Sequence, residues 1–392
     1  MSQGCLLLVK SLYGTKQGGH QWHKLLKKTL IELGFNCLSS EESVYIRDNI
    51  TIAVYVDDIL VACETEEEFK TFKAELNSKF KVGKAGKADH LLGIRISQTG
   101  DGITMDQETY VEAILEEYWD QKTKYRTPMS TTKLEDQTIK IEDPTIRADY
   151  LRLLGKIMYL AHCTRPDLAY TFSKLSRYTH NFGKDHWEAL IRVVGYLAET
   201  KSWKLKYAEG INELEVYTDA DWNVKTTAGY ILMLKIKGTE PESAPICWKA
   251  WVLKSAALNT MEAEYHALAG GVKELRWVVM FMEELERMKV KKGGVICYVD
   301  NSACIELAGK PKFREKAKHI DIRKNFIRES MDEGLINITK ISTHYNTSDI
   351  LTKSLAKDKH LLHSSSLLVL SASGDVMDKP NNYHWRIGRC DE

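Results

Sequence analysis

The sequence contains no apolar run that approaches the roughly 18 residues a membrane-spanning helix needs, and it shows no signal-peptide pattern. Neither membrane insertion nor secretion is therefore indicated. The 392 residues are 43% hydrophobic and 28% charged, which is typical of a soluble globular protein with two or three domains. We expect an intracellular protein, in the cytoplasm or the nucleus.

Cysteine pairs with the CxxC spacing are also absent, although the chain has eight cysteines. Zinc sites built from cysteine commonly use such closely spaced pairs. We therefore expect buried or free thiols in a reducing compartment rather than a structural zinc site. The cysteines are Cys5, Cys37, Cys63, Cys163, Cys247, Cys297, Cys304 and Cys390.

An excess of positive charge is missing too, because 55 lysines and arginines are balanced by 54 aspartates and glutamates, and the formal net charge is +1. A protein that binds the phosphate backbone of nucleic acid normally presents a basic surface. Any nucleic-acid binding by this chain must then depend on local clusters of basic residues.

The sequence does contain a β-prone run that carries carboxylates, VYTDADW at residues 216–222. On a strand, Tyr217, Asp219 and Asp221 point to one face, because side chains alternate. Burying an ionised carboxylate costs several kcal/mol unless a cation or a hydrogen-bond donor compensates it. The acidic pair therefore suggests a metal site, and the alternative is an edge strand whose polar face lies in water.

Apolar residues at helical spacing predict a helix over residues 260–288. Glu264 lies one turn from apolar residues on either side and so flanks the buried face of this helix. Glu262 points well away from that face. Of the two acids, Glu264 is therefore the better candidate for a buried site.

Two more acids follow in the chain. The run VICYVD, within residues 294–305, predicts a strand that ends at Asp300, after which Ser302 can open a helix. Another strand is predicted over residues 336–341, followed by a helix start near Asp349. The order is strand-Asp, helix-Glu, strand-Asp, helix-Asp.

The motifs VYTDADW, TAGY, MEAEYHAL, YVDNSA, KHIDIRKNFIRE and SDILTKSL occur in this order within residues 214–355. This region resembles the ribonuclease H domain of a copia-type retrotransposon Pol polyprotein. Residues 10–207 resemble the reverse transcriptase of the same family. Together they resemble a Pol fragment that contains the C-terminal part of the reverse transcriptase and the ribonuclease H.

The resemblance implies two Mg²⁺ ions that hydrolyse the RNA strand of an RNA–DNA hybrid, one turning water into a nucleophile and the other stabilising the leaving 3′ oxygen. Asp219 is preferred over Asp221 for its Tyr-Thr-Asp context. Glu264 is preferred over Glu262 because AEYHAL resembles the family's catalytic helix. Both choices stay open. The implied catalytic and metal-binding residues are Asp219, Glu264, Asp300 and Asp349.

A basic run directly follows the Asp300 element and leads into His319, Arg323 and Lys324. Such a run is often only a solvated face. Beside a metal-carboxylate site, a role in binding the phosphates of nucleic acid is the better interpretation. The run consists of Lys310, Lys312, Arg314, Lys316 and Lys318.

TIAVYVDDILVACET, residues 51–65, predicts a hairpin with Asp57 and Asp58 at its tip, followed by a helix over residues 64–80. An Asp-Asp turn alone is common. Within YVDDILVA it resembles the reverse transcriptase motif, in which a third aspartate on a neighbouring strand completes a site for two Mg²⁺ ions. That aspartate lies upstream of SLYG in the family, whereas no aspartate precedes Asp48 here. We expect that the chain as written does not polymerise DNA.

Other segments suggest nucleic-acid contacts. SLYGTKQ resembles the family's SLYGLKQ, which implies contacts of Lys16 and Gln17 with template and incoming nucleotide. Gln107 and Tyr110 match positions of the family's primer-contacting hairpin and thumb, although either can serve in packing. Arg165, in a turn between predicted helices, is either structural or a phosphate contact.

The expected fold class is α+β or α/β, with a partial polymerase palm and thumb, a helical connection, and a ribonuclease H-like mixed sheet with flanking helices. The tail loses the family pattern, and we expect it to be poorly ordered. The expected parts are residues 1–125 (palm and thumb), 126–209 (linker and connection), 210–357 (ribonuclease H-like domain) and 358–392 (divergent tail).

The expected partners are an RNA–DNA hybrid, or an RNA template with a DNA primer, and no membrane; the oligomeric state is open. A competing hypothesis is a decayed transposon remnant that folds and at most binds nucleic acid. The shortened loop after Trp222 and the longer segment before Trp248 predict weak ribonuclease activity. A shift of Asp219 by about 1 Å can cost on the order of a hundredfold in rate.

Overall fold

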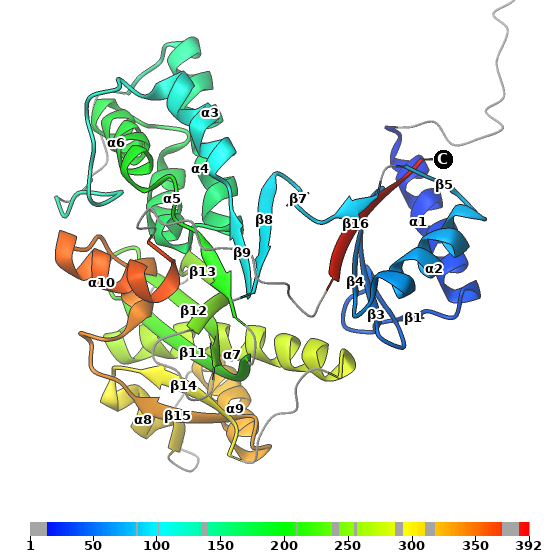
Figure 1. The fold of residues 1–392 in the computed structure, drawn as a ribbon. Coiled ribbons are helices and arrows are strands. Elements are labelled where there is room, and N and C mark those ends of the chain that lie inside the picture. The colour runs from blue at the N-terminus through cyan, green and yellow to red at the C-terminus, as the bar shows by residue number, and fades with distance from the viewer. Residues whose placement is uncertain are drawn as a thin grey trace, which may run out of the picture. The chain divides into compact units, whose positions relative to one another are not determined.

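A computed structural model of the chain forms two compact units (Figure 1). Unit 1 comprises Met1–Leu91, Met280–Arg287 and Pro380–Glu392, and unit 2 comprises Leu92–Val279 and Met288–Lys379. The expected palm-and-thumb segment, residues 1–125, is thus divided between the two units. The structure describes residues 14–83, 85–100, 102–132, 134, 140–208, 211–236, 243–254, 257–286, 293–309, 318–370 and 384–391.

Unit 1 combines a sheet with helices. Its elements are α1 (Lys16–Glu32), β1 (Asn36–Cys37), β2 (Val44–Arg47), β3 (Ile50–Tyr55), β4 (Asp58–Cys63), α2 (Glu66–Asn77), β5 (Lys81–Val82), β6 (Gly86–Lys87), β7 (His90–Leu91) and β16 (His384–Asp391). Strands β3 and β4 form the hairpin predicted over residues 51–65. The sheet runs β1, β2, β3, β4, β16, and β16 also pairs with β5 and β6.

The core of unit 1 follows from two simple periodicities. Helix α1 buries Trp22, Leu26 and Leu30, which are spaced four residues apart and so share one face. Strand β3 buries the alternate residues Ile50 and Ile52. These side chains belong to one hydrophobic cluster, which holds the helix and the hairpin together.

In the tail, which we expected to be poorly ordered, the structure describes a helix and a strand. Residues 384–389 of β16 pair antiparallel with residues 58–63 of β4, and helix α10 (Lys357–Leu367) belongs to unit 2. The buried side of α10 consists of His360, His363, Ser364 and Leu367. A buried face made mostly of polar residues gives no apolar periodicity in the sequence, which explains the difference.

Unit 2 begins with a small antiparallel sheet and a group of helices. The elements are β8 (Ile94–Thr99), β9 (Gly102–Asp106), α3 (Glu108–Tyr118), α4 (Pro144–Cys163), η1 (Pro166–Leu168), α5 (Ala169–Leu175), η2 (Ser176–Tyr178), α6 (Lys184–Thr200) and β10 (Leu205–Tyr207). Strand β9 pairs with both β8 and β10. In the described part of the chain, every helix is too short or too polar to cross a membrane.

Arg165 is buried between these helices. Its side chain is 2% exposed, and its Nη2 lies 2.7 Å from Oδ2 of Asp167. The guanidinium also donates to the carbonyl and hydroxyl oxygens of Thr200, and the Tyr196 hydroxyl donates to Asp167. These internal partners favour the structural interpretation of Arg165 over a phosphate contact.

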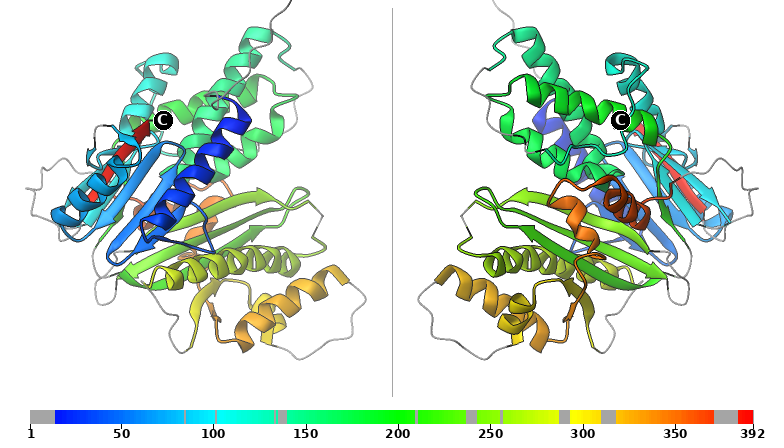
Figure 2. Two further views of the ribbon diagram at one scale, coloured as in Figure 1. Left: turned by 90° about the vertical axis from the view of Figure 1, so that its right-hand side faces the viewer. Right: turned by 90° about the vertical axis from the view of Figure 1, so that its left-hand side faces the viewer.

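The rest of unit 2 is a five-stranded mixed sheet with helices on both faces. Its elements are β11 (Ile211–Asp221), β12 (Thr227–Ile236), β13 (Ser243–Val252), α7 (Thr260–Glu284), β14 (Val295–Val299), α8 (Ser302–Gly309), α9 (Lys318–Asp332), β15 (Ile336–Lys340) and η3 (Thr347–Leu351). Residues 280–284 of α7 are assigned to unit 1. The order is β13-β12-β11-β14-β15, antiparallel among the first three strands and parallel thereafter. Figure 2 shows α7 on one face of the sheet and α10 on the other. The mixed α and β fold class is confirmed.

Replacing Asp167 by alanine should lower the free energy of unfolding by about 3–5 kcal/mol, because the Arg165 guanidinium is then buried without a counter-charge. The control is Glu188→Ala, which removes a pair with Lys184 whose side chains are 81% (Lys184) and 61% (Glu188) exposed. It should change stability by about 0.5 kcal/mol or less. Urea unfolding followed by circular dichroism measures both, and equally small effects would contradict a stabilising role for the buried pair.

Candidate metal centre

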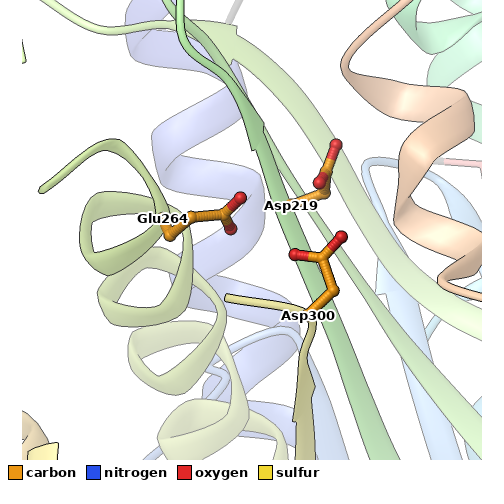
Figure 3. A group of neighbouring side chains, drawn as sticks. All are labelled: Asp219, Glu264 and Asp300. Atoms are coloured by element: carbon orange, nitrogen blue, oxygen red, sulfur yellow. The ribbon is translucent and has the colours of Figure 1, made fainter. Parts of the chain in front are cut away.

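Three carboxylates from three different elements converge in unit 2 (Figure 3). Asp219 lies on β11, Glu264 in the second turn of α7, and Asp300 directly after β14. One oxygen of each lies within 4.8 Å of the other two, and Asp219 and Glu264 are buried. No other set of at least three acidic, histidine or cysteine side chains comes together in this way in the described part of the chain.

Strand register and a glycine bring these acids together. The parallel strands β11 and β14 pair Tyr217 with Tyr298, so Asp219 and Asp300 follow two residues later at equivalent positions. Helix α7 lies close to β11 at Gly271, where a Cβ would lie 3.1 Å from the side chain of Val216. This close approach fits the reach of the Glu264 side chain from α7 to the two aspartates.

Burial and crowding raise the pKa of two of these carboxyls. Burial raises the pKa of Asp219 to about 7; Lys353 opposes this shift, and the neighbouring Asp349 and Asp300 add to it. Burial raises the pKa of Glu264 to about 10, and Asp219 and Asp300 raise it further. The Oε2 atom of Glu264 is buried and has no hydrogen-bond partner. A cation bound here would offset both the burial and the repulsion.

Asp349 is placed differently. It is fully buried in η3, and the Nζ of Lys353 lies 2.7 Å from its Oδ1, although without hydrogen-bond geometry. Lys359, from α10, donates to its Oδ2. The Lys353 ammonium also lies 3.6 Å from Oδ2 of Asp219. The structure therefore gathers three of the four predicted ligands and pairs the fourth with two lysines. That Asp349 binds metal stays a prediction.

Gly229 explains how η3 comes so close to the strand of Asp219. It pairs with Asp219 across β11 and β12. A Cβ at this position would lie 2.7 Å from the Cβ of Leu351 and 3.1 Å from Cγ2 of Thr352, which is closer than ordinary packing allows. Without a side chain at 229, the Thr352 hydroxyl reaches Asp219 and donates to its Oδ2.

Four residues that touch the site were not identified from the sequence. A glycine inside a strand often marks a close approach of another segment, which is a usable signal for Gly229. Lys353 lies four residues after Asp349, a spacing at which opposite charges meet on a helix. Thr352 and Lys359 have no comparable signal, since Lys359 lies just inside the segment expected to be poorly ordered.

The structure favours one residue in each pair left open by the sequence. Glu262 lies in the first turn of α7, where its Oε2 accepts a hydrogen bond from the Leu258 N–H at 2.7 Å. Asp221 ends β11, pairs with Thr227 and does not belong to the acidic cluster. Asp219 and Glu264 are the members of these pairs that enter the cluster.

The polymerase-like acids lie in unit 1. Asp57 and Asp58 are half-buried at the tip of the β3–β4 hairpin. Val56 precedes them with a φ of 56°, a conformation that β-branched residues rarely adopt, and the indole Nε1 of Trp22 donates to its carbonyl oxygen at 2.7 Å. In the part of the chain that the structure describes, no third ligand joins the pair. Metal binding by these two acids stays a prediction.

Only some of the residues predicted to contact nucleic acid lie in the part of the chain that the structure describes. Lys16 and Gln17 are exposed in the first turn of α1. Gln107 is buried and its Oε1 accepts a hydrogen bond from Thr164 at 2.8 Å, and Tyr110 packs on a neighbouring tyrosine, so both fit the packing alternative. Outside the described residues lie Lys310, Lys312, Arg314, Lys316 and the side chain of Lys318.

Known proteins match both parts of the chain. Residues 1–131 match the family described as reverse transcriptase (RNA-dependent DNA polymerase). The chain is 30% identical over 373 residues to the retrovirus-related Pol polyprotein from transposon TNT 1-94 of Nicotiana tabacum, covering 90% of this chain and 27% of that protein. It is 31% identical over 283 residues to the putative transposon Ty5-1 protein YCL074W of Saccharomyces cerevisiae, covering 68% of this chain and 89% of that protein.

The chain therefore spans about a quarter of the length of the tobacco relative. Among solved structures, it is similar to the foamy viral protease-reverse transcriptase in complex with dsDNA, with 15% sequence identity and a TM-score of 0.43. That similarity covers 85% of this chain and 60% of the viral chain.

Gly229→Ala should destabilise the protein by about 1–3 kcal/mol, because the added methyl group overpacks against Leu351. The matched control is Gly155→Ala in α4, where a Cβ meets nothing within 4 Å. This control should stabilise the protein by about 0.5–1 kcal/mol, the usual gain from replacing a helical glycine. Thermal unfolding compares the two, and a neutral Gly229→Ala would contradict the proposed close approach of η3.

The metal-free protein should lose stability as the pH rises. A carboxyl whose pKa is higher in the folded than in the unfolded chain stabilises the fold below the unfolded pKa and loses that contribution as the pH rises through the folded pKa. For Glu264 this window extends from 4.5 to about 10. In EDTA near pH 8, Glu264→Gln should be more stable than the wild type by roughly 2 kcal/mol.

Denaturant unfolding at a series of pH values measures this effect. Asp332→Asn, on the exposed surface of α9, serves as the control and should keep the wild-type profile. Parallel profiles for Glu264→Gln and the wild type would show that Glu264 does not carry the pH dependence.

Proposed function

The chain belongs to the copia-type retrotransposon Pol family, and from this premise we propose that unit 2 hydrolyses the RNA strand of RNA–DNA hybrids with Mg²⁺. The observation that carries the proposal is the convergence of Asp219, Glu264 and Asp300 within 4.8 Å. Paired carboxylates that hold divalent ions are a common means of cleaving phosphodiesters.

The residues fit a hard divalent cation. The donors in the cluster are all carboxylate oxygens, which suit Mg²⁺ or Mn²⁺ better than softer metals. A backbone hydrogen bond from Ala220 reaches the Glu264 carboxylate, but its buried Oε2 has no donor that compensates its charge. A bound ion would supply this compensation, and it would lower the pKa of a water molecule and stabilise negative charge on the leaving oxygen.

The chain's own part in the reaction is to fix the ligands. Strands β11 and β14 hold Asp219 and Asp300 side by side through their parallel register. Helix α7 holds Glu264, and the Thr352 hydroxyl orients Asp219. In the two-ion arrangement that the family resemblance implies, Asp349 would reach a second ion only by giving up part of its pairing with lysine.

For unit 1 we propose a role in nucleic-acid binding, supported by the match of residues 1–131 to reverse transcriptases. Asp57 and Asp58 would form part of a Mg²⁺ site there, and Lys16 and Gln17 would contact template and nucleotide. In unit 2, the basic run from Lys310 to Lys318 would bind the phosphates of the hybrid.

Hydrolysis can be tested on the full chain with an end-labelled RNA–DNA hybrid, with Mg²⁺ and with Mn²⁺. Asp300→Asn should lower the cleavage rate by about a hundredfold or more, because it removes a ligand of the ion. Asp332→Asn, exposed on α9, is the matched control and should retain the wild-type rate. Cleavage that persists in Asp300→Asn would refute the site, and no cleavage with either ion would favour a non-catalytic, nucleic-acid-binding remnant.

A further inference from the structure

Lys353 lies between two acids of the site. Its Nζ is 2.7 Å from Oδ1 of Asp349 and 3.6 Å from Oδ2 of Asp219. The lysine side chain is 33% exposed, whereas those carboxylates are almost completely buried. Burial lowers the pKa of Lys353, but Asp219 and Asp349 raise it above its usual value. Little water screens these charges, so the ammonium interacts strongly with both acids.

Asp349 already has another cationic partner. Lys359 of α10 donates to its Oδ2. Asp219, by contrast, has Lys353 as its one cationic partner within 4 Å among the described residues. Lys359 can therefore balance Asp349, and the charge of Lys353 is available to Asp219.

The packing around Asp219 places the backbone of Lys353 next to the site. Lys353 follows Asp349 by one helical turn, and between them Thr352 donates to Asp219. Gly229, opposite Asp219, leaves the space that this segment fills. The ammonium is therefore held on the side of Asp219 that faces Asp349.

The family resemblance implies two divalent ions in this site. We propose that the Lys353 ammonium takes the place of one of them. One divalent ion binds among Asp219, Glu264 and Asp300, while Lys353 neutralises Asp219 and Asp349 on their shared side. The inference rests on the proposed function, since it requires the divalent site. A second divalent ion that bridged Asp219 and Asp349 would have to displace the ammonium, because like charges at this distance repel each other.

The charges of the site agree with this assignment. The four carboxylates carry four negative charges when ionised, and Lys353 and Lys359 carry two positive charges. The remaining two negative charges match one divalent ion. With Lys353 removed, the site would carry an additional negative charge next to Asp219 and would attract cations more strongly.

Metal binding to the full chain tests the proposal without nucleic acid. All proteins carry Asp57→Asn and Asp58→Asn, so that unit 1 does not contribute ions. In isothermal titration with Mn²⁺, the protein with Lys353 should bind one ion, and Lys353→Met should bind two. The first ion should bind Lys353→Met about tenfold or more tightly than the parent, because a nearby positive charge is gone. Lys353→Arg, which keeps the charge, should still bind one.

The control is Lys235→Met, which removes a different lysine–carboxylate pair. The Nζ of Lys235 lies 3.2 Å from Oε1 of Glu215, which is on the same strand as Asp219. It should bind one ion with the parent affinity. If Lys353→Met does not fold without metal, the double variant Lys353→Met, Asp349→Asn leaves no uncompensated charge at that position, and it should fold and bind one ion.

Two ions bound by the parent, with no change in Lys353→Met, would overturn the role of Lys353 while leaving hybrid hydrolysis intact. A single ion in Lys353→Met with unchanged affinity would overturn it as well. Absence of binding in every variant would overturn both this inference and the proposed function. The hybrid cleavage assay on the same proteins separates the two, because it reports hydrolysis whatever the number of ions.

Discussion

Repulsion among buried carboxylates is the constraint on which the arrangement of unit 2 depends. Asp219, Glu264 and Asp300 lie within 4.8 Å of one another, and Asp349 is completely buried beside them. Burying an ionised carboxylate costs several kcal/mol unless a cation or a hydrogen-bond donor compensates its charge. The fold meets the constraint in two ways: two carboxyls have raised pKa values, and two lysines lie beside Asp349.

The segments that pack around the site also supply the positive charges that compensate its carboxylates. Gly229, opposite Asp219, has no side chain, so η3 can pack close to the strand. This packing places Thr352 and Lys353 beside Asp219. Helix α10 adds Lys359 from a segment that the family resemblance does not cover. A site that depends on a tail helix for its electrostatics is sensitive to changes far along the chain, even though no ligand of the ion comes from that helix.

Strand alternation and helical periodicity placed Asp219 on one face of a strand and Glu264 beside the buried face of a helix, and the family resemblance implied that these acids share a site. Asp219, Glu264 and Asp300 lie together in the structure. The same patterns could not predict that Asp349 is paired with lysines, since an ion pair between elements leaves no periodic signal. Helix α10 was missed for a related reason: its buried histidines and serine read as a polar segment.

The shortened loop after Trp222 was expected to weaken ribonuclease activity by shifting Asp219. The pairing of the strand that carries Asp219 addresses this expectation. Strands β11 and β12 stay in register from Glu213 to Asp221, including the pairs Asp219 with Gly229 and Asp221 with Thr227. The irregularities lie elsewhere, before Glu213 on β11 and at Leu232 in the pairing of β12 with β13. A short loop that closes a regular hairpin does not by itself displace Asp219. The position of the Lys353 ammonium, rather than the loop, is then the stronger physical determinant of how the site binds cations.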